Sequence, residues 1–336
     1  MCRRIVVCCL LAAACSSGCS PLPLDGHPTP GDLLSSVTTW AYQIQSIAEA
    51  GSVDALANST YDMLVVEPTR SDRDQADFDT AAMVWRLKAT PGANGNRKLV
   101  IAYVDIGEAE DWRSYWAADW VAPTADEPGN PDFLLTVDPD GWAGNYPVAY
   151  WDPRWHDVVI SAEGSALQQV LDDGFDGIYL DWVEAYDDEH VVSAADAAGL
   201  DPADEMIRFI ADLRSAARAR NPAFLVIQQN APALAEGRPE ALDVVDAIGQ
   251  EDVWFAGDAD VDWTDPAAGD VPTPTGGDPY TTEWYVQRLQ QYRQAGKPVF
   301  TIDYALDQGH SANVYRDSRA LGFVPFVSRT PLDRLP

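Results

Sequence analysis

The chain has 336 residues, of which 53 are acidic and 22 are basic, so its formal net charge is −31. This balance excludes a nucleic-acid-binding protein, because so few Lys and Arg side chains cannot neutralise a phosphate backbone in the presence of so many carboxylates. With 46% hydrophobic and 10% aromatic residues, the composition is that of a globular protein with a large core.

The N-terminus has the composition of an export signal. Two arginines precede an apolar run over residues 5–14, which is too short to span a bilayer, and small residues follow. Cys15 follows Ala-Ala-Ala and Cys19 follows Ser-Ser-Gly, an arrangement that resembles the lipobox of bacterial lipoproteins. We predict a signal peptide over residues 1–14 and lipidation of Cys15; Cys19, or ordinary signal-peptidase cleavage, is the alternative. In each case the protein is exported, as a cell-envelope lipoprotein or a secreted protein, and a lipid anchor would be its only membrane contact.

All cysteines lie in this N-terminal region. They are Cys2, Cys8, Cys9, Cys15 and Cys19. The rest of the chain therefore has neither a disulfide nor a thiolate site. Residues 15–37 are rich in Pro, Gly and Ser, which predicts a linker, and residues 38–336 form the predicted folded domain.

Short apolar runs along this domain predict β-strands. Several are continuous rather than alternating, as expected of strands buried on both faces. The runs are Trp40–Gln45, Tyr61–Glu67, Leu99–Ile106, Val148–Trp151, Gly177–Trp182, Phe224–Gln229, Val245–Gln250, Val299–Tyr304 and Phe323–Val327. An eight-stranded barrel needs one run fewer, so we expect either Val148–Trp151 or Phe323–Val327 to be irregular.

Segments with helical spacing lie between most of these runs. A cap and a first-turn proline at residues 201–202 begin an amphipathic stretch that ends at residue 220, before another proline. Similar spacing occurs over residues 78–88, 165–171 and 281–294. This alternation predicts an α/β protein with a single (β/α)8 TIM-like barrel. An open doubly wound sheet is the alternative, but it usually carries a glycine-rich phosphate loop, and this sequence has none.

In such a barrel, catalytic side chains lie at the carboxyl ends of the strands. Acids, amides and aromatic residues occupy those positions here. They include Gln43, Glu67, Asp105, Glu108, Tyr150, Trp151, Asp181, Asn230, Glu251, Asp303 and Tyr304. This mixture is typical of a sugar site, because aromatic faces stack on pyranose rings, amides bind hydroxyls and paired carboxylates cleave glycosidic bonds.

Asp181 and Glu251 are the strongest catalytic candidates. Each ends an apolar run, in GIYLD and AIGQE, where a buried environment can tune its pKa. A helix cap is the alternative role for Asp181, and an exposed turn is the alternative for Glu251. Glu108 could also begin a helix, where acids favour the positive end of the dipole.

Other chemistries are disfavoured by the sequence. The four histidines form no zinc-binding motif. The sequence has no GxSxG elbow, and the predicted domain has no cysteine to act as a nucleophile. We therefore predict no metal site and no cofactor.

Seven segments of the domain resemble, in the same order, those of glycoside hydrolase family 114, which contains the endo-α-1,4-polygalactosaminidases. They are WAYQIQ, YVDIGEAEDWRSYW, VAYWDPRW, DGFDGIYLDWVEAY, IGQEDVWF, FTIDYA and GFVPFVS. The most specific pieces are IGEAEDWRSYW and GFDGIYLDWVEAY. The resemblance implies a TIM-like barrel that cleaves α-1,4-linked galactosamine polymers internally, with Asp181 as nucleophile and Glu251 as general acid/base.

The resemblance also places the other strand-end residues at pocket positions, although Glu67 stands where related barrels more often carry Asp. It implies a retaining mechanism with the two carboxyl groups roughly 5–5.5 Å apart, whereas inversion requires about 6.5–9.5 Å. A non-catalytic glycan-binding barrel lipoprotein and a hydrolase of another exopolysaccharide are the alternatives. The acidic surface would attract a polycationic substrate, or would simply keep an exported protein soluble. We expect a monomer.

Overall fold

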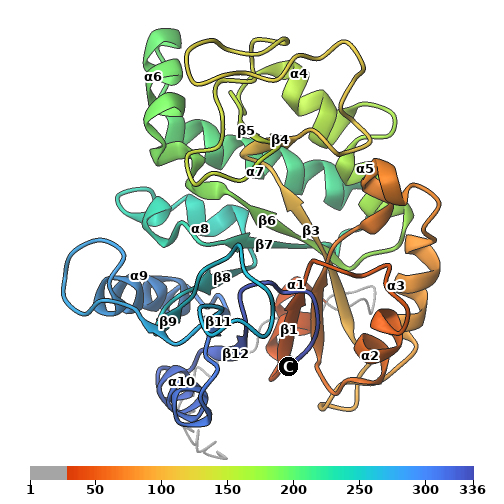
Figure 1. Cartoon of the computed structure of the whole chain (residues 1–336), viewed down its shortest axis with the longest axis vertical. Helices are drawn as coiled ribbons and strands as arrows, with labels where there is room; N and C mark the ends of the chain where they lie inside the picture. Colours follow the sequence, from red (N-terminus) through yellow and green to blue (C-terminus); the bar gives the residue numbers. More distant parts are fainter. Residues whose placement is uncertain (1–28) are drawn as a thin grey trace, which may run out of the picture.

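The computed structural model describes residues 29–336, so the predicted signal peptide, Cys15 and Cys19 lie outside the described residues. Eight strands form one parallel sheet at the centre of the molecule (Figure 1). In sheet order they are β1 (Trp40–Gln43), β2 (Met63–Val66), β3 (Leu99–Asp105), β6 (Gly177–Asp181), β7 (Leu225–Gln229), β8 (Ala247–Glu251), β11 (Val299–Tyr304) and β12 (Val324–Ser328). The order in the sheet follows the order in the chain, as a (β/α)8 barrel requires.

The sheet curls into a nearly closed barrel. Its two outer strands, β1 and β12, are joined by Trp40, whose Nε1 donates to the carbonyl of Val324 over 2.9 Å. The amides of Ile44 and Gln45 both donate to the carbonyl of Leu332, over 3.1 Å each, so the C-terminal segment also ties onto the end of β1. The α/β barrel predicted from the alternation of runs is confirmed.

One of the two doubtful runs is irregular, as expected. Val148 forms an isolated antiparallel bridge with Leu134, and a turn follows at residues 150–151, so this run is not a strand of the barrel. The amide of Val148 donates to the carbonyl of Gly107 over 3.0 Å, and the amide of Ala149 donates to the carbonyl of Phe133 over 2.9 Å. Loop segments bury this run, which explains why a run of apolar residues occurs outside the barrel strands. The other doubtful run supplies β12.

Helices surround the strands (Figure 1). They are α1 (Pro30–Ser35), α2 (Ser52–Asn58), α3 (Thr80–Lys88), α4 (Pro153–His156), α5 (Ala166–Asp172), α6 (Glu189–Ala198), α7 (Pro202–Arg220), α8 (Ala241–Val244), α9 (Thr282–Gln294) and α10 (Gln308–Ala320). The predicted start of α7 is confirmed, since the Asp201 side chain accepts from the amide of Asp204 and Pro202 occupies the first turn. Within residues 29–336, no helix is long and apolar enough to cross a bilayer.

Helix α1 lies inside the segment predicted to be a linker. The side chain of Thr29 accepts from the amide of Asp32, and the carboxylate of Asp32 accepts from the amide of Thr29, which makes a capping box. Pro30 occupies the first turn, and Leu34 is buried against the barrel. Pro30 and Gly31 therefore belong to the first turn of a helix and not to a linker. The folded domain begins before residue 38.

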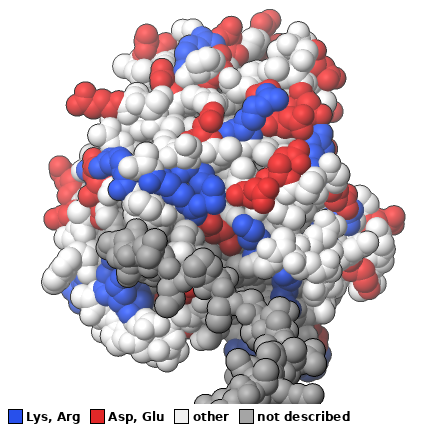
Figure 2. All heavy atoms as spheres, turned by 180° about the vertical axis from the view of Figure 1, so that it is seen from behind, with Lys and Arg blue, Asp and Glu red and all other residues white. Residues whose placement is uncertain are grey.

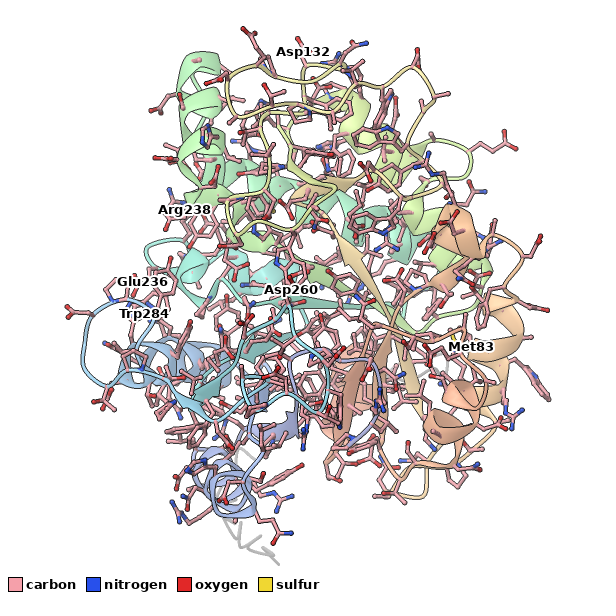
Figure 3. All side chains as sticks on the ribbon, viewed as in Figure 1. Met83, Asp132, Glu236, Arg238, Asp260 and Trp284 are labelled. Atoms are coloured by element: carbon pink, nitrogen blue, oxygen red, sulfur yellow. The ribbon has the colours of Figure 1, made fainter. Side chains whose placement is uncertain are left out.

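Two long excursions leave the strands at their carboxyl ends. Residues 111–144 lie between β4 (Glu108–Glu110) and β5 (Asn145–Pro147), which pair antiparallel, and Asp132 marks this excursion in Figure 3. Residues 257–270 lie between β9 (Phe255–Ala256) and β10 (Val271–Pro272), and Asp260 marks this one. The alternative that Glu108 begins a helix is wrong, because its backbone pairs with Pro147.

Aromatic side chains fill the interior of the barrel. The ring centroid of Trp40 lies 5.5 Å from the ring centroid of Phe300 and 5.9 Å from that of Phe326. The ring of Tyr42 lies 5.4 Å from that of Tyr179. All five side chains are buried. Large aromatic rings in contact across the barrel make this interior a packed core and not a channel.

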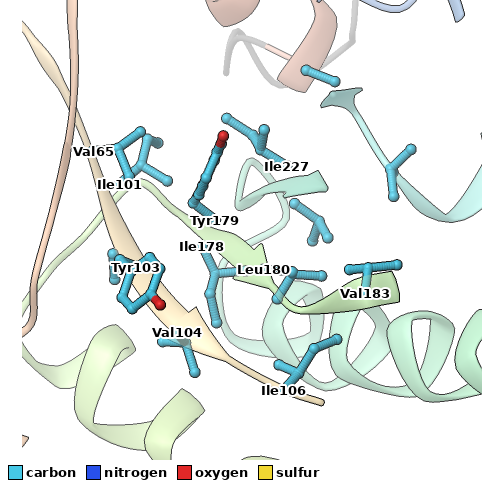
Figure 4. Packing of buried hydrophobic residues seen from close by; sticks show 14 of the residues in the cluster. Val65, Ile101, Tyr103, Val104, Ile106, Ile178, Tyr179, Leu180, Val183 and Ile227 are labelled. Carbon is cyan, nitrogen blue, oxygen red and sulfur yellow. The ribbon is translucent and has the colours of Figure 1, made fainter. Parts of the chain in front are cut away.

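Tyr179 illustrates how this core is accommodated. Tyr179 and Ile178 leave β6 on opposite sides, as alternation along a strand requires (Figure 4). Its hydroxyl reaches across to Gly249 on β8, where any Cβ atom would overlap the Tyr179 ring. The glycine in the run AIGQE therefore makes room for a tyrosine beneath the carboxyl ends of the strands.

Candidate active site

Two acidic side chains at the amino ends of the strands are paired with bases. Asp176, just before β6, contacts Lys88 and Arg97 over 2.8 Å each. Asp246, just before β8, contacts Arg218 over 2.8 Å. Figure 2 shows Lys and Arg side chains gathered over the middle of the face that is turned away in Figure 1. Despite the large negative charge of the chain, these acids are neutralised and stabilise the barrel.

Asp181 lies at the opposite end of the barrel. It is the last residue of β6 and the only residue of that strand that is not buried. Its Oδ1 accepts from the amide of Trp182 over 2.7 Å, and its Oδ2 accepts from the hydroxyl of Tyr103. Burial raises the pKa of Asp181 to about 7, and the negative charge of Glu251 adds to the rise. This carboxyl group is therefore poised to change its charge near neutral pH.

Glu251 occupies the same position in β8, as the only residue of that strand that is not buried. Its Oε2 accepts from Nε2 of Gln229 over 2.6 Å and from Nδ2 of Asn230 over 3.1 Å. Its Oε1 accepts from the hydroxyl of Tyr304. Oδ1 of Asn230 also accepts from the amide of Glu251 over 2.9 Å. Three side-chain donors thus fix the orientation of this carboxylate.

A chain of tyrosine and amide groups supports both carboxyl groups from below. The hydroxyl of Tyr42 donates to Oε1 of Gln229 over 3.2 Å, and Gln229 in turn donates to Glu251. The ring of Tyr42 lies 6.2 Å from the ring of Tyr103, which donates to Asp181. The two carboxyl groups therefore rest on one packed layer of the barrel interior.

Two further carboxyl groups lie beside the pair. Glu184 follows the end of β6 by three residues, and Asp252 directly follows Glu251. Burial raises the pKa of each of them to about 8. The charge of Asp181 adds to the rise at Glu184, and that of Glu251 adds to the rise at Asp252. Oε1 of Glu184 also accepts from the amide of Ala231 over 3.2 Å.

The backbone is strained at the same end of the barrel. The residues that directly follow β6, β7 and β8 have positive φ angles although they are not glycine. These are Trp182 at 49°, Asn230 at 52°, Ala231 at 51° and Asp252 at 58°. Such conformations are costly for residues with a Cβ atom and persist where the surrounding structure imposes them, as at functional sites.

Asp105 and Glu108 were predicted at this end and lie there. Asp105 pairs in register with Asp181 across β3 and β6. Its Oδ1 accepts from the amides of Gly107 and Glu108, over 3.0 and 2.8 Å. Glu108 accepts from Nδ2 of Asn145 over 3.0 Å. Burial raises the pKa of Asp105 well above its usual range and that of Glu108 to about 11, and repulsion between them adds to the rise at Glu108. Burial therefore favours the neutral form of both carboxyl groups.

Gln43, Tyr150 and Trp151 were predicted to bind substrate and have other contacts in the structure. Nε2 of Gln43 donates to the carbonyl of Asp333 over 3.0 Å, which holds the C-terminal segment against β1. Tyr150 is fully buried, and its hydroxyl donates to the carbonyl of Pro202 over 2.6 Å. Trp151 is half-buried, with its ring 5.1 Å from that of Tyr150. Their place in substrate binding stays a prediction.

Glu67 and Asp303 are likewise engaged by the protein. Glu67 forms an ion pair with the buried guanidinium of Arg113. Asp303 is fully buried, and its Oδ1 accepts from the amides of residues 254 and 255, over 2.6 and 3.0 Å. It thereby holds the turn that follows Glu251. Both carboxyl groups thus already have partners within the protein. A direct contact of either residue with substrate also stays a prediction.

The structure adds residues that sequence reasoning missed. Tyr103 precedes Asp105 by two residues, so strand alternation places both on the same face, a signal that could have identified it. Arg113 lies in an irregular excursion, where no periodic pattern marks it. Its role depends on contacts that only the folded chain brings together.

The sequence matches a family model described as glycoside-hydrolase family GH114 over residues 29–335. An uncharacterised protein from Deinococcus radiodurans is 33% identical over 308 residues, which cover 92% of this chain and 85% of that protein. An uncharacterised protein from Methanocaldococcus jannaschii is 28% identical over 310 residues, which cover 87% of this chain and 75% of that protein.

Two solved structures share the fold. The glycoside hydrolase domain of PelA from Pseudomonas aeruginosa has a TM-score of 0.59 and 18% identity, covering 89% of this chain and 97% of that domain. Aspergillus fumigatus Ega3, solved in complex with galactosamine, has a TM-score of 0.60 and 17% identity, covering 94% of this chain and 97% of Ega3. At this identity the likeness concerns the barrel fold.

Proposed function

Because the chain belongs to glycoside-hydrolase family GH114, we propose that it cleaves an α-1,4-linked, galactosamine-containing polysaccharide internally, with Asp181 and Glu251 as the catalytic pair. The observation that carries this proposal is the placement of these two carboxyl groups. Each ends a strand of the barrel, is the only partly exposed residue of that strand, and accepts a hydrogen bond from a tyrosine. A barrel that only binds glycans has no need of two carboxyl groups held in this way.

The proposed reaction is a double displacement. Asp181 attacks the anomeric carbon while Glu251 donates its proton to the leaving glycosidic oxygen, which breaks the glycosidic bond and forms a glycosyl ester on Asp181. Glu251 then takes a proton from water, and the resulting hydroxide displaces Asp181 from the anomeric carbon. The product keeps its anomeric configuration, and both carboxyl groups return to their starting states.

The carboxyl groups beside the pair support an amino sugar as substrate. Glu184 and Asp252 are partly exposed, and their partial burial, together with nearby acids, raises the pKa of each carboxyl group. An ammonium group of the substrate would favour their ionised forms and form charge-assisted hydrogen bonds with them. The net charge of −31 would also speed the encounter with a polycation. Galactosamine bound to the structurally similar Ega3 is consistent with this substrate class.

Reducing-end release from defined polymers tests the substrate. The protein should release reducing ends from de-N-acetylated α-1,4-galactosaminan, with oligosaccharides as early products. Glu184→Gln should lower kcat/KM on this polymer by about tenfold or more, because a charge-assisted hydrogen bond is lost, and should have a smaller effect on the N-acetylated polymer.

Glu189→Gln is the matched control, because Glu189 is an exposed glutamate on the neighbouring helix α6. It should leave both activities unchanged. Equal losses on the two polymers would remove Glu184 from amine recognition. Binding of galactosaminan without release of reducing ends would favour the non-catalytic alternative, and cleavage of a neutral polymer alone would replace the substrate.

We also propose that the enzyme is exported and anchored through lipidated Cys15. The basic, apolar and small-residue regions at residues 1–15 support this, and so does the confinement of all cysteines to residues 1–19. Cells fed labelled palmitate should yield a labelled protein in the membrane fraction, and Cys15→Ala should abolish the label. A protein that stays labelled after this substitution would point to Cys19, and an unlabelled wild-type protein would refute the anchor.

A further inference from the structure

We propose that Tyr103 is a positioning residue for the catalytic pair, whose hydroxyl orients Asp181 and favours its ionised form for attack on the anomeric carbon. This inference rests on the proposed function, in which Asp181 is the nucleophile. It concerns a residue that neither strand-end position nor the family's sequence pattern had singled out.

The register of the sheet places Tyr103 below Asp181. Tyr103 lies directly opposite Tyr179 across β3 and β6, and Asp105 lies opposite Asp181. A tyrosine side chain is long enough to reach the diagonal neighbour two residues further along the adjacent strand. The Tyr103 hydroxyl does so and donates to Oδ2 of Asp181, while the amide of Trp182 donates to Oδ1. Both oxygens are thereby held.

Tyr103 acts as a hydrogen-bond donor at every relevant pH. Its side chain is 8% exposed. Burial raises the pKa of the Tyr103 hydroxyl well above its usual value, and the charge of Asp181 raises it further. A proton that the phenol does not release stabilises the charged form of the carboxylate that accepts it. Among the influences on Asp181, this hydrogen bond is the main one that opposes the effect of burial on its pKa.

The titratable groups near Asp181 on neighbouring elements are mainly carboxyl groups. They are Asp105 on β3, Glu110 on β4, Glu184 beyond β6 and Glu251 on β8. The phenols of Tyr42 on β1 and Tyr179 on β6 also lie near it, and burial raises their pKa values well above the usual range, so they stay neutral. The charges of Glu251 and Glu110 disfavour a negative charge on Asp181. The hydrogen bond from Tyr103, together with that from the amide of Trp182, opposes them.

Tyr179 offers a matched control in the same layer. Like Tyr103 it is buried and near Asp181, but its hydroxyl has no hydrogen-bond partner within residues 29–336. Tyr103→Phe and Tyr179→Phe each remove one hydroxyl from adjacent strands of one core. Only the first removes a hydrogen bond to a catalytic carboxylate.

The test follows the titration of Asp181 by carboxyl ¹³C NMR, with the signal assigned by its absence in Asp181→Asn. Tyr103→Phe should raise the pKa of Asp181 by about one to two units, the size expected for losing a hydrogen bond to a charged group. The acidic limb of kcat/KM against pH should move to higher pH by the same amount, and kcat should fall more than KM rises. Tyr179→Phe should change none of these.

A second substitution tests the same hydrogen bond if Tyr103→Phe does not fold. Tyr103→3-fluorotyrosine keeps the ring and hydroxyl but makes the phenol a stronger donor, so the pKa of Asp181 should move down and the acidic limb to lower pH. Equal titrations in wild type, the Tyr103 variants and Tyr179→Phe would overturn the inference. A shifted Asp181 titration in a protein that releases no reducing ends would refute the proposed hydrolase instead, which separates the two failures.

Discussion

Asp181→Asn and Glu251→Gln are each expected to lower kcat on de-N-acetylated galactosaminan by about a thousandfold or more, because each removes a group that forms or breaks a bond in the proposed reaction. The amides keep the size of the side chains. The carbonyl oxygen of each new amide can still accept the hydrogen bond from Tyr103 or Tyr304, so the supporting layer should persist. Reducing-end release at saturating substrate measures the loss.

Thermal unfolding shows whether the loss is chemical. The pKa of Asp181 in the folded protein is raised to about 7 by burial, above the value of about 3.9 in an unfolded chain. The folded state therefore holds this proton more tightly, and wild type loses the corresponding stability as pH rises from about 4 to 7. Asp181→Asn should unfold at an equal or higher temperature than wild type at pH 8. A folded variant that keeps wild-type turnover would contradict the assignment of Asp181.

Azide separates the roles of the two carboxyl groups. If Asp181 is the nucleophile, azide should attack in its place in Asp181→Gly and produce a glycosyl azide of inverted configuration. In Glu251→Gly, azide should instead intercept the glycosyl ester on Asp181 and produce the retained configuration. The opposite pattern would exchange the two roles and leave the pair itself intact.

Arg113→Met is expected to lower the free energy of unfolding by about 3–5 kcal/mol, because it leaves buried carboxylates without a counter-charge. Arg113 is 5% exposed and forms ion pairs with Glu67 and Glu110. It also donates to the hydroxyl of Ser71 over 2.8 Å. Urea denaturation measures the change, and adding Glu67→Gln and Glu110→Gln to the variant should recover part of it.

Arg154→Met is the matched control for this ion-pair network. Arg154 also contacts two acids, Asp132 and Asp152, but its side chain is 53% exposed. Exposed pairs of this kind contribute about 0–1 kcal/mol, since water screens them. A similarly small effect of Arg113→Met would show that Glu67 and Glu110 are not charged in the folded protein. It would also reopen Glu67 as a substrate-binding residue.

The sequence predicted the barrel well because its signals are local. The runs that became β3 and β6 are apolar up to their final aspartate, and the cap at residues 201–202 begins α7 as expected. The excursion over residues 111–144 was harder, because its short hairpin has no periodicity. A helix start was an alternative for Glu108, but in the structure Glu108 lies in a strand, because its backbone pairs with Pro147.

For the site, the strand-end rule identified Asp181 and Glu251 and several acids around them. It did not distinguish carboxyl groups that face the opening from those that support it. Asp303 ends up fully buried beneath the turn after Glu251, and Glu67 pairs with Arg113. Position along a strand places a residue at an end of the barrel, but its partners come from other strands.

By itself, the sequence determined the type of fold, the order of the strands and the end of the barrel where acids gather, because apolar runs, caps and turns act over a few residues. The tertiary structure alone decided which acids are paired with bases and which accept hydrogen bonds from Tyr103 and Tyr304. These contacts depend on the register between strands and on closure of the barrel. The two hydrogen bonds join residues that are 78 and 53 positions apart in the chain, beyond the reach of any local pattern.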